Sequence, residues 1–281
     1  IRRPPRSTPK PSSAASDVYK RQIRNNVCVG GRRIALLDNF TWGNPERPDR
    51  LGELVRAAEA CYETAKGYGT PFISGKDSLY NESPLGPVTS TLLITAIGII
   101  PDIRKAVSSD LKDVGNPVYI VGETLNELGG SEYYRLKGFL GNNVPKVNLK
   151  VGRETVNRIV KAIDGGYVRA CHDPSEGGLA VALSEMTIGG DLGLEISISE
   201  IPRRNVSRNT QILFSESNSR FIVEVKKKFS EEFEKLFDGL PHAKVGYVTG
   251  SKSLVIHGLG GDVIIDVEVD DLERAWKTGL R

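Results

Sequence analysis

The sequence contains few of the residues that build metal centres and covalent active sites. It has three cysteines, three histidines and one methionine in 281 residues. Cys28, Cys61 and Cys171 lie far apart and lack the paired spacing of a zinc site, so we expect reduced, buried thiols in a cytoplasmic protein. No Ser-His-Asp or Cys-His arrangement is visible in the sequence. These absences leave no candidate for a covalent nucleophile.

Long apolar runs and a charge field of one sign are also missing. No apolar run approaches the roughly 20 residues of a transmembrane helix, and we find no signal peptide. Residues 1–22 hold six Lys or Arg and one Asp, a charge of +5, which leaves −2 of the formal +3 on residues 23–281. We therefore expect no nucleic-acid partner and no membrane, and any anion must bind at a local site.

The first 22 residues differ from the rest of the chain. They are rich in Pro, Ser and Arg, lack apolar periodicity, and begin with Ile rather than Met. This composition predicts a disordered basic tail or a non-native extension, because it resembles translated sequencing-adapter sequence. We expect the natural polypeptide to continue upstream of Ile23, and this chain to be a truncated half.

Thirty glycines and fifteen prolines among many short apolar runs indicate an α/β protein. Apolar residues at helical spacing predict a helix from Leu51 to Ala65 that ends near Gly67 and Gly69. The polar, irregular stretch 101–115 predicts a domain boundary. The other predicted elements are strands at 34–38, 71–73, 91–100, 117–121, 167–170, 194–198, 220–225, 244–249, 253–257 and 263–267, and helices around 156–163, 179–188 and 230–237.

The segment 75–82, Gly-Lys-Asp-Ser-Leu-Tyr-Asn-Glu, is predicted to be a polar loop that follows a short strand. Gly75 allows close approach of the backbone to a ligand. Lys76 can neutralise a phosphate, Asp77 can hold a metal, and Ser78 offers a hydroxyl. A solvated hairpin is the alternative interpretation of the same residues.

Three further segments accompany this loop in a fixed order. They are 38–45 (Asp-Asn-Phe-Thr-Trp-Gly-Asn-Pro), 127–133 (Glu-Leu-Gly-Gly-Ser-Glu-Tyr) and 172–179 (His-Asp-Pro-Ser-Glu-Gly-Gly-Leu). Together the four segments resemble the C-terminal half of the large subunit of phosphoribosylformylglycinamidine synthases. The resemblance runs from about Ile23 to the C-terminus.

This resemblance implies two α/β domains of the aminoimidazole-ribonucleotide-synthetase superfamily. They would be a four-stranded N-terminal unit at 23–115 and a larger C-terminal α/β unit at 116–281. The implied activity is a glutamine-dependent carbon–nitrogen ligase reaction of purine biosynthesis, in which formylglycinamide ribonucleotide is amidated with consumption of ATP. The catalytic residues are expected in the missing N-terminal half, so the ligase would be incomplete here.

The resemblance also implies roles for the first two segments. Asp38 and Gly75 match ATP contacts, and Ser78 matches a substrate contact. Lys76 stands where a magnesium-binding Asn is often found, and an ammonium cannot ligate a metal, so Lys76 is expected to pair with phosphate. Asp77 is then the substitute candidate for Mg²⁺. Without the resemblance, Asp38 would be a turn or capping residue.

The 172–179 segment has a role only in the long, single-chain members of the family. There the residues that match Asp173 and Ser175 contact Mg²⁺ and a nucleotide in an auxiliary site. An upstream helix adds an Asn that matches Asn25 and a Glu that would fall at Arg21, so one ligand is missing. The unpaired peptide N–H groups of the following helix also favour an anion, and a helix cap by Asp173 or Ser175 is the alternative interpretation. His172 is expected to be structural.

The resemblance implies several partners. They are the missing N-terminal half, a glutaminase subunit, since no cysteine offers its nucleophile, and a small PurS-type subunit. Two alternatives stay open. One is another enzyme of the superfamily, of the cyclo-ligase, selenophosphate or thiamine-phosphate kinase type. The other is a half without turnover that acts as a structural and nucleotide-binding module. A tight turn alone is the alternative interpretation of residues 128–132. Segments 75–82 and 127–133 together argue for the synthase and against its relatives.

Overall fold

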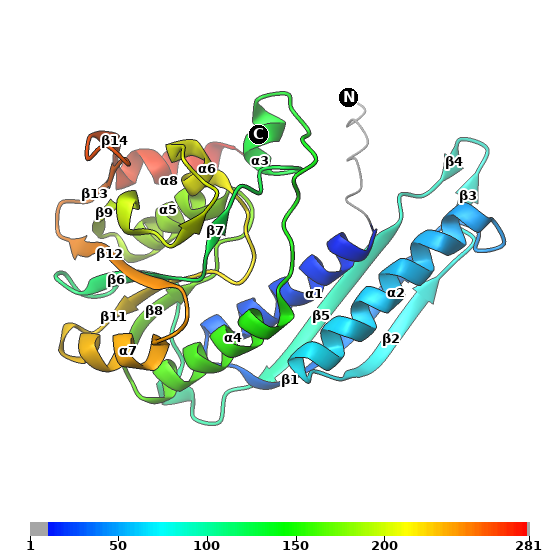
Figure 1. Cartoon of the computed structure of the whole chain (residues 1–281), viewed down its shortest axis with the longest axis horizontal. Coiled ribbons are helices and arrows are strands. Elements are labelled where there is room, and N and C mark those ends of the chain that lie inside the picture. The colour runs from blue at the N-terminus through cyan, green and yellow to red at the C-terminus, as the bar shows by residue number, and fades with distance from the viewer. Residues whose placement is uncertain (1–10, 280–281) are drawn as a thin grey trace.

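The computed structural model describes residues 11–279, with side chains from residue 19 onward. An N-terminal unit of long strands and helices projects as an arm from a compact C-terminal body (Figure 1). The mixed α/β class and the division into two such units agree with the prediction. No helix in the described part of the chain is long and apolar enough to cross a bilayer.

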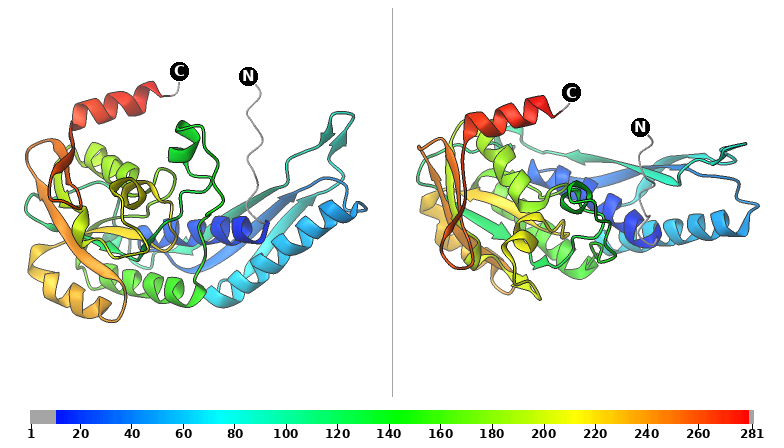
Figure 2. Two further views of the ribbon diagram at one scale, coloured as in Figure 1. Left: turned by 45° about the horizontal axis from the view of Figure 1, so that its top comes forward. Right: turned by 90° about the horizontal axis from the view of Figure 1, so that it is seen from above.

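The N-terminal unit is a three-stranded sheet covered by helices on one face. The strand order is β2-β1-β5, with β1 parallel to β2 and antiparallel to β5. Helices α1 and α2 lie along one side of these strands (Figure 2). The elements are α1 (Pro11–Cys28), β1 (Arg32–Thr41), α2 (Pro48–Tyr68), β2 (Phe72–Ser78), β3 (Glu82–Ser83), β4 (Gly86–Pro87) and β5 (Thr91–Ile99).

We expected a four-stranded sheet in this unit. Within the described residues the sheet has three strands. The short strands β3 and β4 pair only with each other, as a hairpin beyond the end of β2. Helix α2 agrees with its prediction: proline stands in its first turn, and Gly69 ends it with a left-handed φ of 70°.

The expectation of a disordered tail through residue 22 is wrong for residues 11–22, which belong to α1. Tyr19, Ile23 and Val27 are spaced four residues apart, so they share one helical face, and all three are buried. The Tyr19 hydroxyl also donates to the carbonyl oxygen of Thr70 at 2.8 Å. The Pro- and Ser-rich composition hid this short periodic stretch. Residues 1–10 lie outside the described residues, and a non-native origin of the segment stays a prediction.

The C-terminal body is built on a seven-stranded mixed sheet with the order β14-β13-β9-β12-β6-β11-β8. Both faces are covered by helices (Figures 1 and 2). Its strands are β6 (Pro117–Val121), β8 (Val168–His172), β9 (Gly193–Ser197), β11 (Phe221–Val225), β12 (His242–Thr249), β13 (Ser253–His257) and β14 (Val263–Glu268), and β7 (Thr124–Leu125) pairs separately with β10 (Arg203–Arg204). Its helices are α3 (Glu132–Leu136), α4 (Leu149–Asp164), α5 (Gly178–Gly190), α6 (Asn209–Phe214), α7 (Ser230–Phe237) and α8 (Val269–Thr278).

Strand β6 shows why this sheet was predictable. All five of its residues are buried, because Tyr119 and Val121 face one hydrophobic cluster while Val118 and Ile120 face the other. A strand covered on both faces needs apolar residues at every position, so it appears in the sequence as a continuous apolar run. Strand 117–121 and helix 230–237 match their predicted bounds. Sequence analysis missed α3, α6, α8 and the short strands β7 and β10.

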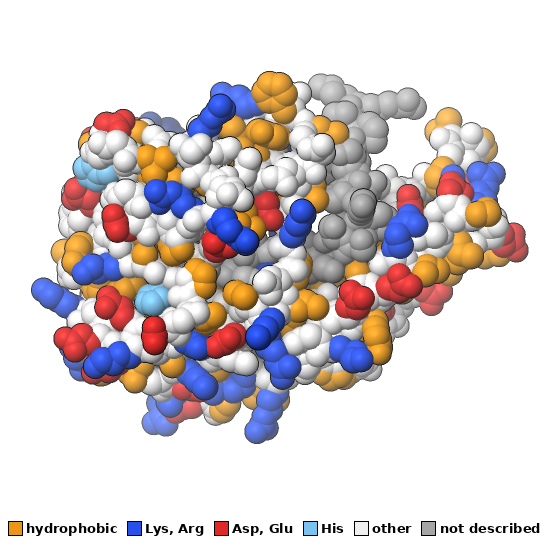
Figure 3. Space-filling model, in the orientation of Figure 1, with side chains coloured by type: hydrophobic (Ala, Val, Ile, Leu, Met, Phe, Trp, Pro, Cys, Tyr) orange, Lys and Arg blue, Asp and Glu red, His pale blue; other side chains and the backbone are white. Residues whose placement is uncertain are grey.

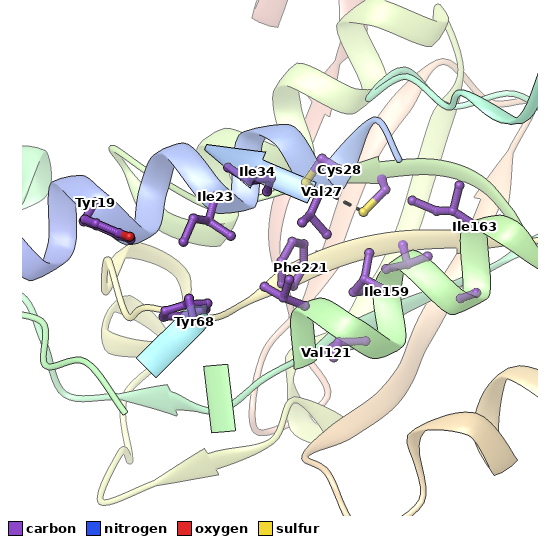
Figure 4. Close-up of a cluster of buried hydrophobic side chains, with 14 of the residues drawn as sticks. Tyr19, Ile23, Val27, Cys28, Ile34, Tyr68, Val121, Ile159, Ile163 and Phe221 are labelled. Atoms are coloured by element: carbon purple, nitrogen blue, oxygen red, sulfur yellow. Dashed lines mark hydrogen bonds between the residues drawn. The ribbon is translucent and has the colours of Figure 1, made fainter. Parts of the chain in front are cut away.

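The N-terminal unit and the C-terminal body share one core. Side chains of α1, including Ile23 and Val27, pack with Ile159 of α4 and Phe221 of β11 in a single buried cluster (Figure 4). The chain passes from β5 to β6 through residues 100–116, which include a 3-10 turn, η1 (Ile103–Lys105). The predicted boundary falls in this connection, and the exact division of the chain stays a prediction.

Candidate functional site

Asp38 and Gly75 face each other on neighbouring parallel strands. The Asp38 carboxylate fills the space next to Gly75, so a Cβ at position 75 would overlap its oxygen. The carboxylate accepts the backbone N–H of Lys76, which lowers the pKa of Asp38, but burial outweighs this and the pKa lies above its ordinary value. Glycine is therefore required at position 75 by a side chain of the protein itself.

The predicted loop at 75–78 is part of a strand, which corrects the sequence interpretation. Strand β1 does not end at Asp38 but continues to Thr41, and it pairs with β2 through Ser78. Residues 38–41 and 75–78 thereby satisfy each other's backbone hydrogen bonds. Polar side chains are compatible with strand structure here because this end of the sheet is exposed to solvent.

A one-residue bulge at Ile73 determines which side chains share a face. Leu36 pairs with Phe72, but Leu37 pairs with Ser74, so β2 contains one extra residue. After the bulge, Gly75 and Asp77 lie on the face of Asp38 and Phe40, which the helices cover. Lys76 and Ser78 lie on the opposite, open face. The bulge thus divides the predicted loop residues between two faces.

On the helix-covered face, Asp38 and Asp77 form an acidic pair near α2. The negative charge of Asp77 raises the pKa of Asp38 further. Burial, together with the negative charge of Asp38, raises the pKa of the Cys61 thiol to about 12. Two neighbouring carboxylates and backbone oxygens are donors that suit Mg²⁺. Within the described residues no third His, Cys, Asp or Glu side chain joins this pair, and the Mg²⁺ ion expected at Asp77 stays a prediction.

The open face combines polar and apolar side chains. Lys76 is exposed and has no side-chain partner in the described chain, and the neighbouring Asn39 has a buried Oδ1 without a hydrogen bond. Leu93 and Ile97 of β5 point to the same face and are more than half exposed. Ser78 is held at the strand end by Asn81, whose Nδ2 donates to the Ser78 carbonyl at 2.6 Å. No element of the described chain covers this face.

Asp173 lies in the interior, immediately after β8. Its carboxylate forms an ion pair with Arg24 of α1, Nε to Oδ2 at 3.2 Å, and both side chains are less than 10% exposed. The side-chain amide of Asn25 lies against the Asp173 carboxylate, and when the amide is assigned with its nitrogen toward Asp173 it donates to the two oxygens at 3.0 and 2.9 Å. Asp173 and Asn25 therefore lie side by side, and the carboxylate of Asp173 accepts hydrogen bonds from the Asn25 amide.

This arrangement does not fit the predicted Mg²⁺ ion at Asn25 and Asp173. Arg24 already neutralises the carboxylate, and Arg21, at the position of the missing acid, pairs with Glu176 at 3.3 Å. Within residues 11–279 no group of three His, Cys, Asp or Glu side chains is placed to hold a metal.

A carboxylate occupies the predicted anion position at the start of α5. Glu216 Oε1 accepts the backbone N–H groups of Gly177 and Glu132, each at 2.9 Å, and burial raises the pKa of Glu216. Gly177 is the N-cap residue, with φ at 79° and no side-chain cap, so neither Asp173 nor Ser175 caps the helix. The nucleotide role expected of Ser175 stays a prediction.

Sequence analysis missed a buried network of charged side chains near the start of α5. Arg220 is fully buried, and its pKa is lowered to about 9 by burial and by the charge of Arg24. Glu127 lies beside it, with a pKa raised by burial, and accepts the N–H of Lys146 at 2.9 Å. The alternation of Ser, Glu and Asn before the apolar strand at 221–225 was the available signal.

The remaining predicted residues have structural contacts. His172 Nε2 lies 2.8 Å from Glu185 Oε2, which agrees with a structural role. Ser131 caps α3, and Gly129 packs against the backbone of Asn143. The three cysteines are free and buried, and the sulfurs of Cys28 and Cys171 lie 3.8 Å apart (Figure 4).

Comparison with solved structures shows the same fold in larger proteins. Thermotoga maritima PurL in complex with FGAR matches with a TM-score of 0.78 at 18% identity, over 94% of this chain and 43% of that one. The ATP complex of the same protein matches with a TM-score of 0.74 at 18% identity, over 94% and 41%. The chain spans about two-fifths of the length of these PurL structures.

A smaller protein also shares the fold. The hydrogenase maturation protein HypE in complex with ATP matches with a TM-score of 0.68 at 17% identity, over 90% of this chain and 79% of that one.

Family models assign the chain to a protein family. The N-terminal domain model of AIR synthase related proteins matches residues 5–100, and the C-terminal domain model matches residues 113–258, just over half of the chain. The chain therefore belongs to the family of AIR synthase related proteins.

Proposed function

We propose that this chain is the C-terminal half of a phosphoribosylformylglycinamidine synthase, an ATP-dependent ligase that amidates formylglycinamide ribonucleotide. The observation that carries the proposal is the open face of the N-terminal sheet. An unpaired lysine and a serine project there beside exposed apolar residues, and nothing in the described chain covers them. An upstream half that packs on Leu93 and Ile97 would enclose Lys76 and Ser78.

In this proposal each strand face has its own task. Lys76 neutralises the phosphoryl group that ATP places on the amide oxygen of the substrate, and Ser78 contacts the substrate. Ammonia, delivered from glutamine by a separate glutaminase subunit, then displaces the phosphate. Asp38 and Gly75 contribute to ATP binding, and Ser175 would contact a nucleotide in the separate, auxiliary site.

The acidic pair Asp38 and Asp77 would hold Mg²⁺, which supplies charge neutralisation for the phosphates. Lys76 and Ser78 reach the open face because the bulge turns them away from this pair. The chain's own contribution is thus to present one cation and one hydroxyl toward the partner half, while two carboxylates remain on the helical side. A small PurS-type subunit completes the proposed assembly.

Reconstitution tests the proposal. The 281-residue chain alone should form no amidated product from formylglycinamide ribonucleotide, ATP and ammonia. Co-expression with the upstream half of its own gene should restore turnover. Robust turnover by the chain alone would overturn the proposal.

One observation favours a second candidate. HypE, whose structure contains ATP, is close in size to this chain, since the match covers 79% of its length. The alternative is a self-contained ATP-dependent enzyme whose second copy covers the open sheet face. Sedimentation and an ATP hydrolysis assay of the chain alone distinguish the two candidates. A stable homodimer that hydrolyses ATP supports the self-contained enzyme, and an inactive monomer supports the half-enzyme.

A further inference from the structure

A cationic hollow lies at the junction of the N-terminal unit and the C-terminal body. It has a volume of about 560 Å³, within the range of small-molecule sites. Three distant segments form its walls: the connection from Arg104 to Lys112, the turn from Asp164 to Arg169, and Lys226 after β11. In Figure 3, Lys and Arg side chains are frequent along the lower edge of the molecule, in the region of α4 and α7 in Figure 1.

The charges around the hollow are unbalanced. Five of its lining side chains are cationic and one is anionic, and the five are Arg104, Lys105, Lys112, Arg169 and Lys226. Three of them have carboxylate partners outside the lining, at Asp102, Asp110 and Asp113. The one lining carboxylate, Asp164, is already paired with Arg32.

Two lysines are left without a carboxylate. Lys105 Nζ donates to the backbone carbonyl oxygen of Asp164 at 3.0 Å. Lys226 is half-buried and has no side-chain partner in the described chain. A partly desolvated ammonium without a counter-ion attracts an anion more strongly than one in bulk water.

The rest of the lining suits a phosphate group. Gly165 and Gly166 form the turn at its edge, and Gly166 has a φ of 72°. Their N–H groups donate to the carbonyl oxygens of Lys161 and Ile163, so the turn leaves space for a ligand but adds no free donor. Ser108 adds a hydroxyl that accepts from Lys112 Nζ at 2.9 Å. Arg169 adds positive charge, although its Nε and Nη2 already donate to Asp113. The volume leaves room for a group attached to the phosphate.

We propose that this hollow binds a phosphate group, either as inorganic phosphate or on a small metabolite. The bound anion would join the connection at Lys105 and Ser108 to the C-terminal body at Gly166 and Lys226. Ser108 already bridges β8, where its carbonyl accepts the N–H of Cys171 at 3.1 Å. A ligand here would therefore strengthen an existing contact between the two units.

The test is a titration of the 281-residue chain with phosphate, pyrophosphate and ATP, against sodium chloride at equal ionic strength. We expect the backbone amide signals of Gly165 and Gly166 to shift in NMR spectra with saturation, and calorimetry to give the affinity. Lys226→Gln should weaken binding about tenfold to a hundredfold, as loss of a charge-assisted contact predicts. Lys161→Gln, an exposed lysine of α4 outside the lining, is the matched control and should leave the affinity unchanged.

The outcomes separate the sources of the phosphate and the two sites. Tighter binding of pyrophosphate or ATP than of phosphate indicates a metabolite, and equal binding indicates the free ion. ATP binding that is lost in Lys76→Ala but not in Lys226→Gln would belong to the proposed nucleotide site and not to the hollow. The proposal is overturned if no anion shifts Gly165 and Gly166, or if both Gln variants weaken binding equally.

Discussion

The two sheets of this protein differ in how many faces are covered. The C-terminal sheet is packed on both sides, and strands such as β6 and β11 are buried at every position. The N-terminal sheet has helices on one side and exposed Leu93, Ile97 and Lys76 on the other. Helices of the described chain cover both faces of the C-terminal sheet, while one face of the N-terminal sheet leaves polar and apolar side chains exposed. The two units share one core, but only the N-terminal sheet leaves a face of apolar side chains uncovered by the described chain.

The largest expected effect tests where the stability resides. Phe221→Ala removes a fully buried ring from β11 and should lower the free energy of unfolding by about 3–5 kcal/mol. Leu93→Ala on the open face is the matched truncation and should change it by less than about 0.5 kcal/mol. Urea denaturation of the isolated chain measures both. A similar cost for the two variants would mean that the open face is packed in solution.

The next effect concerns Lys76 in the assembled enzyme. Lys76→Ala should lower kcat/KM by an amount that corresponds to a loss of about 2–4 kcal/mol of transition-state stabilisation, because a preorganised charge next to the phosphoryl group is lost. Its thermal midpoint should not change, since the side chain has no partner in the described chain. Lys66→Ala, an exposed lysine of α2, is the control.

Lys76→Asn sharpens the same comparison. A side-chain amide can still donate to a phosphoryl oxygen, so this variant should retain more activity than Lys76→Ala. Because residue 76 lies on the face opposite the acidic pair, the magnesium dependence of the two variants should be the same. Steady-state kinetics over a magnesium titration measures both properties. Wild-type kcat/KM in both variants would show that the open face does not take part in the reaction.

A smaller effect tests the contact between Asp38 and Gly75. Gly75→Ala places a Cβ against the Asp38 oxygen and should destabilise the chain by about 1–3 kcal/mol. In an Asp38→Ala background the same change should cost much less, because the overlapping atom is gone. Ser74→Ala on the open face should be nearly neutral. Equal costs in both backgrounds would show that Asp38 does not fill this space.

The smallest effect separates a buried carboxylate of the C-terminal sheet from an exposed one. Glu224 of β11 is fully buried, and burial raises its pKa although Asn116 and two backbone N–H groups bond to it. The folded state therefore takes up a proton at higher pH than the unfolded state does. Between the two pKa values the wild type gains stability as the pH falls, and it loses this gain as the pH rises.

Glu224→Gln removes this titration. Its stability relative to the wild type should decrease as the pH is lowered through the range just above that of an ordinary glutamate. Glu231→Gln, which changes an exposed residue of α7, should show no such trend. Unfolding curves at several pH values check this, and a constant difference across the series would contradict the raised pKa.

The same contrast explains what the sequence could predict. Strands of the C-terminal sheet were found because burial on both faces requires apolar runs, as in residues 117–121. Strand β2 was taken for a loop after Ile73 because its exposed end carries Gly, Lys, Asp and Ser. Helix α1 was missed because only three apolar residues, Tyr19, Ile23 and Val27, repeat at helical spacing, and they follow a Pro- and Ser-rich stretch.

Contacts between distant residues were not predictable from the sequence. The pairing of Arg24 with Asp173 joins positions 149 residues apart, and Glu216 reaches two helix starts from a segment without a recognised motif. Local patterns contain no information on such pairs. The residue types at the predicted positions were suited to the expected chemistry, but their faces and partners came from the three-dimensional arrangement.

The bulge at Ile73 has a consequence for how this strand can change over evolutionary time. Because side chains alternate along a strand, one extra residue inverts the facing of every position that follows it. Deletion of Ile73 alone would remove the bulge but keep Ser74 opposite Leu37, so Lys76 would stay on the open face and Asp77 on the helical side. A relative with a single-residue gap at this position should therefore keep its lysine on the open face, whereas a relative that loses one residue between Ser74 and Lys76 and keeps the bulge should not.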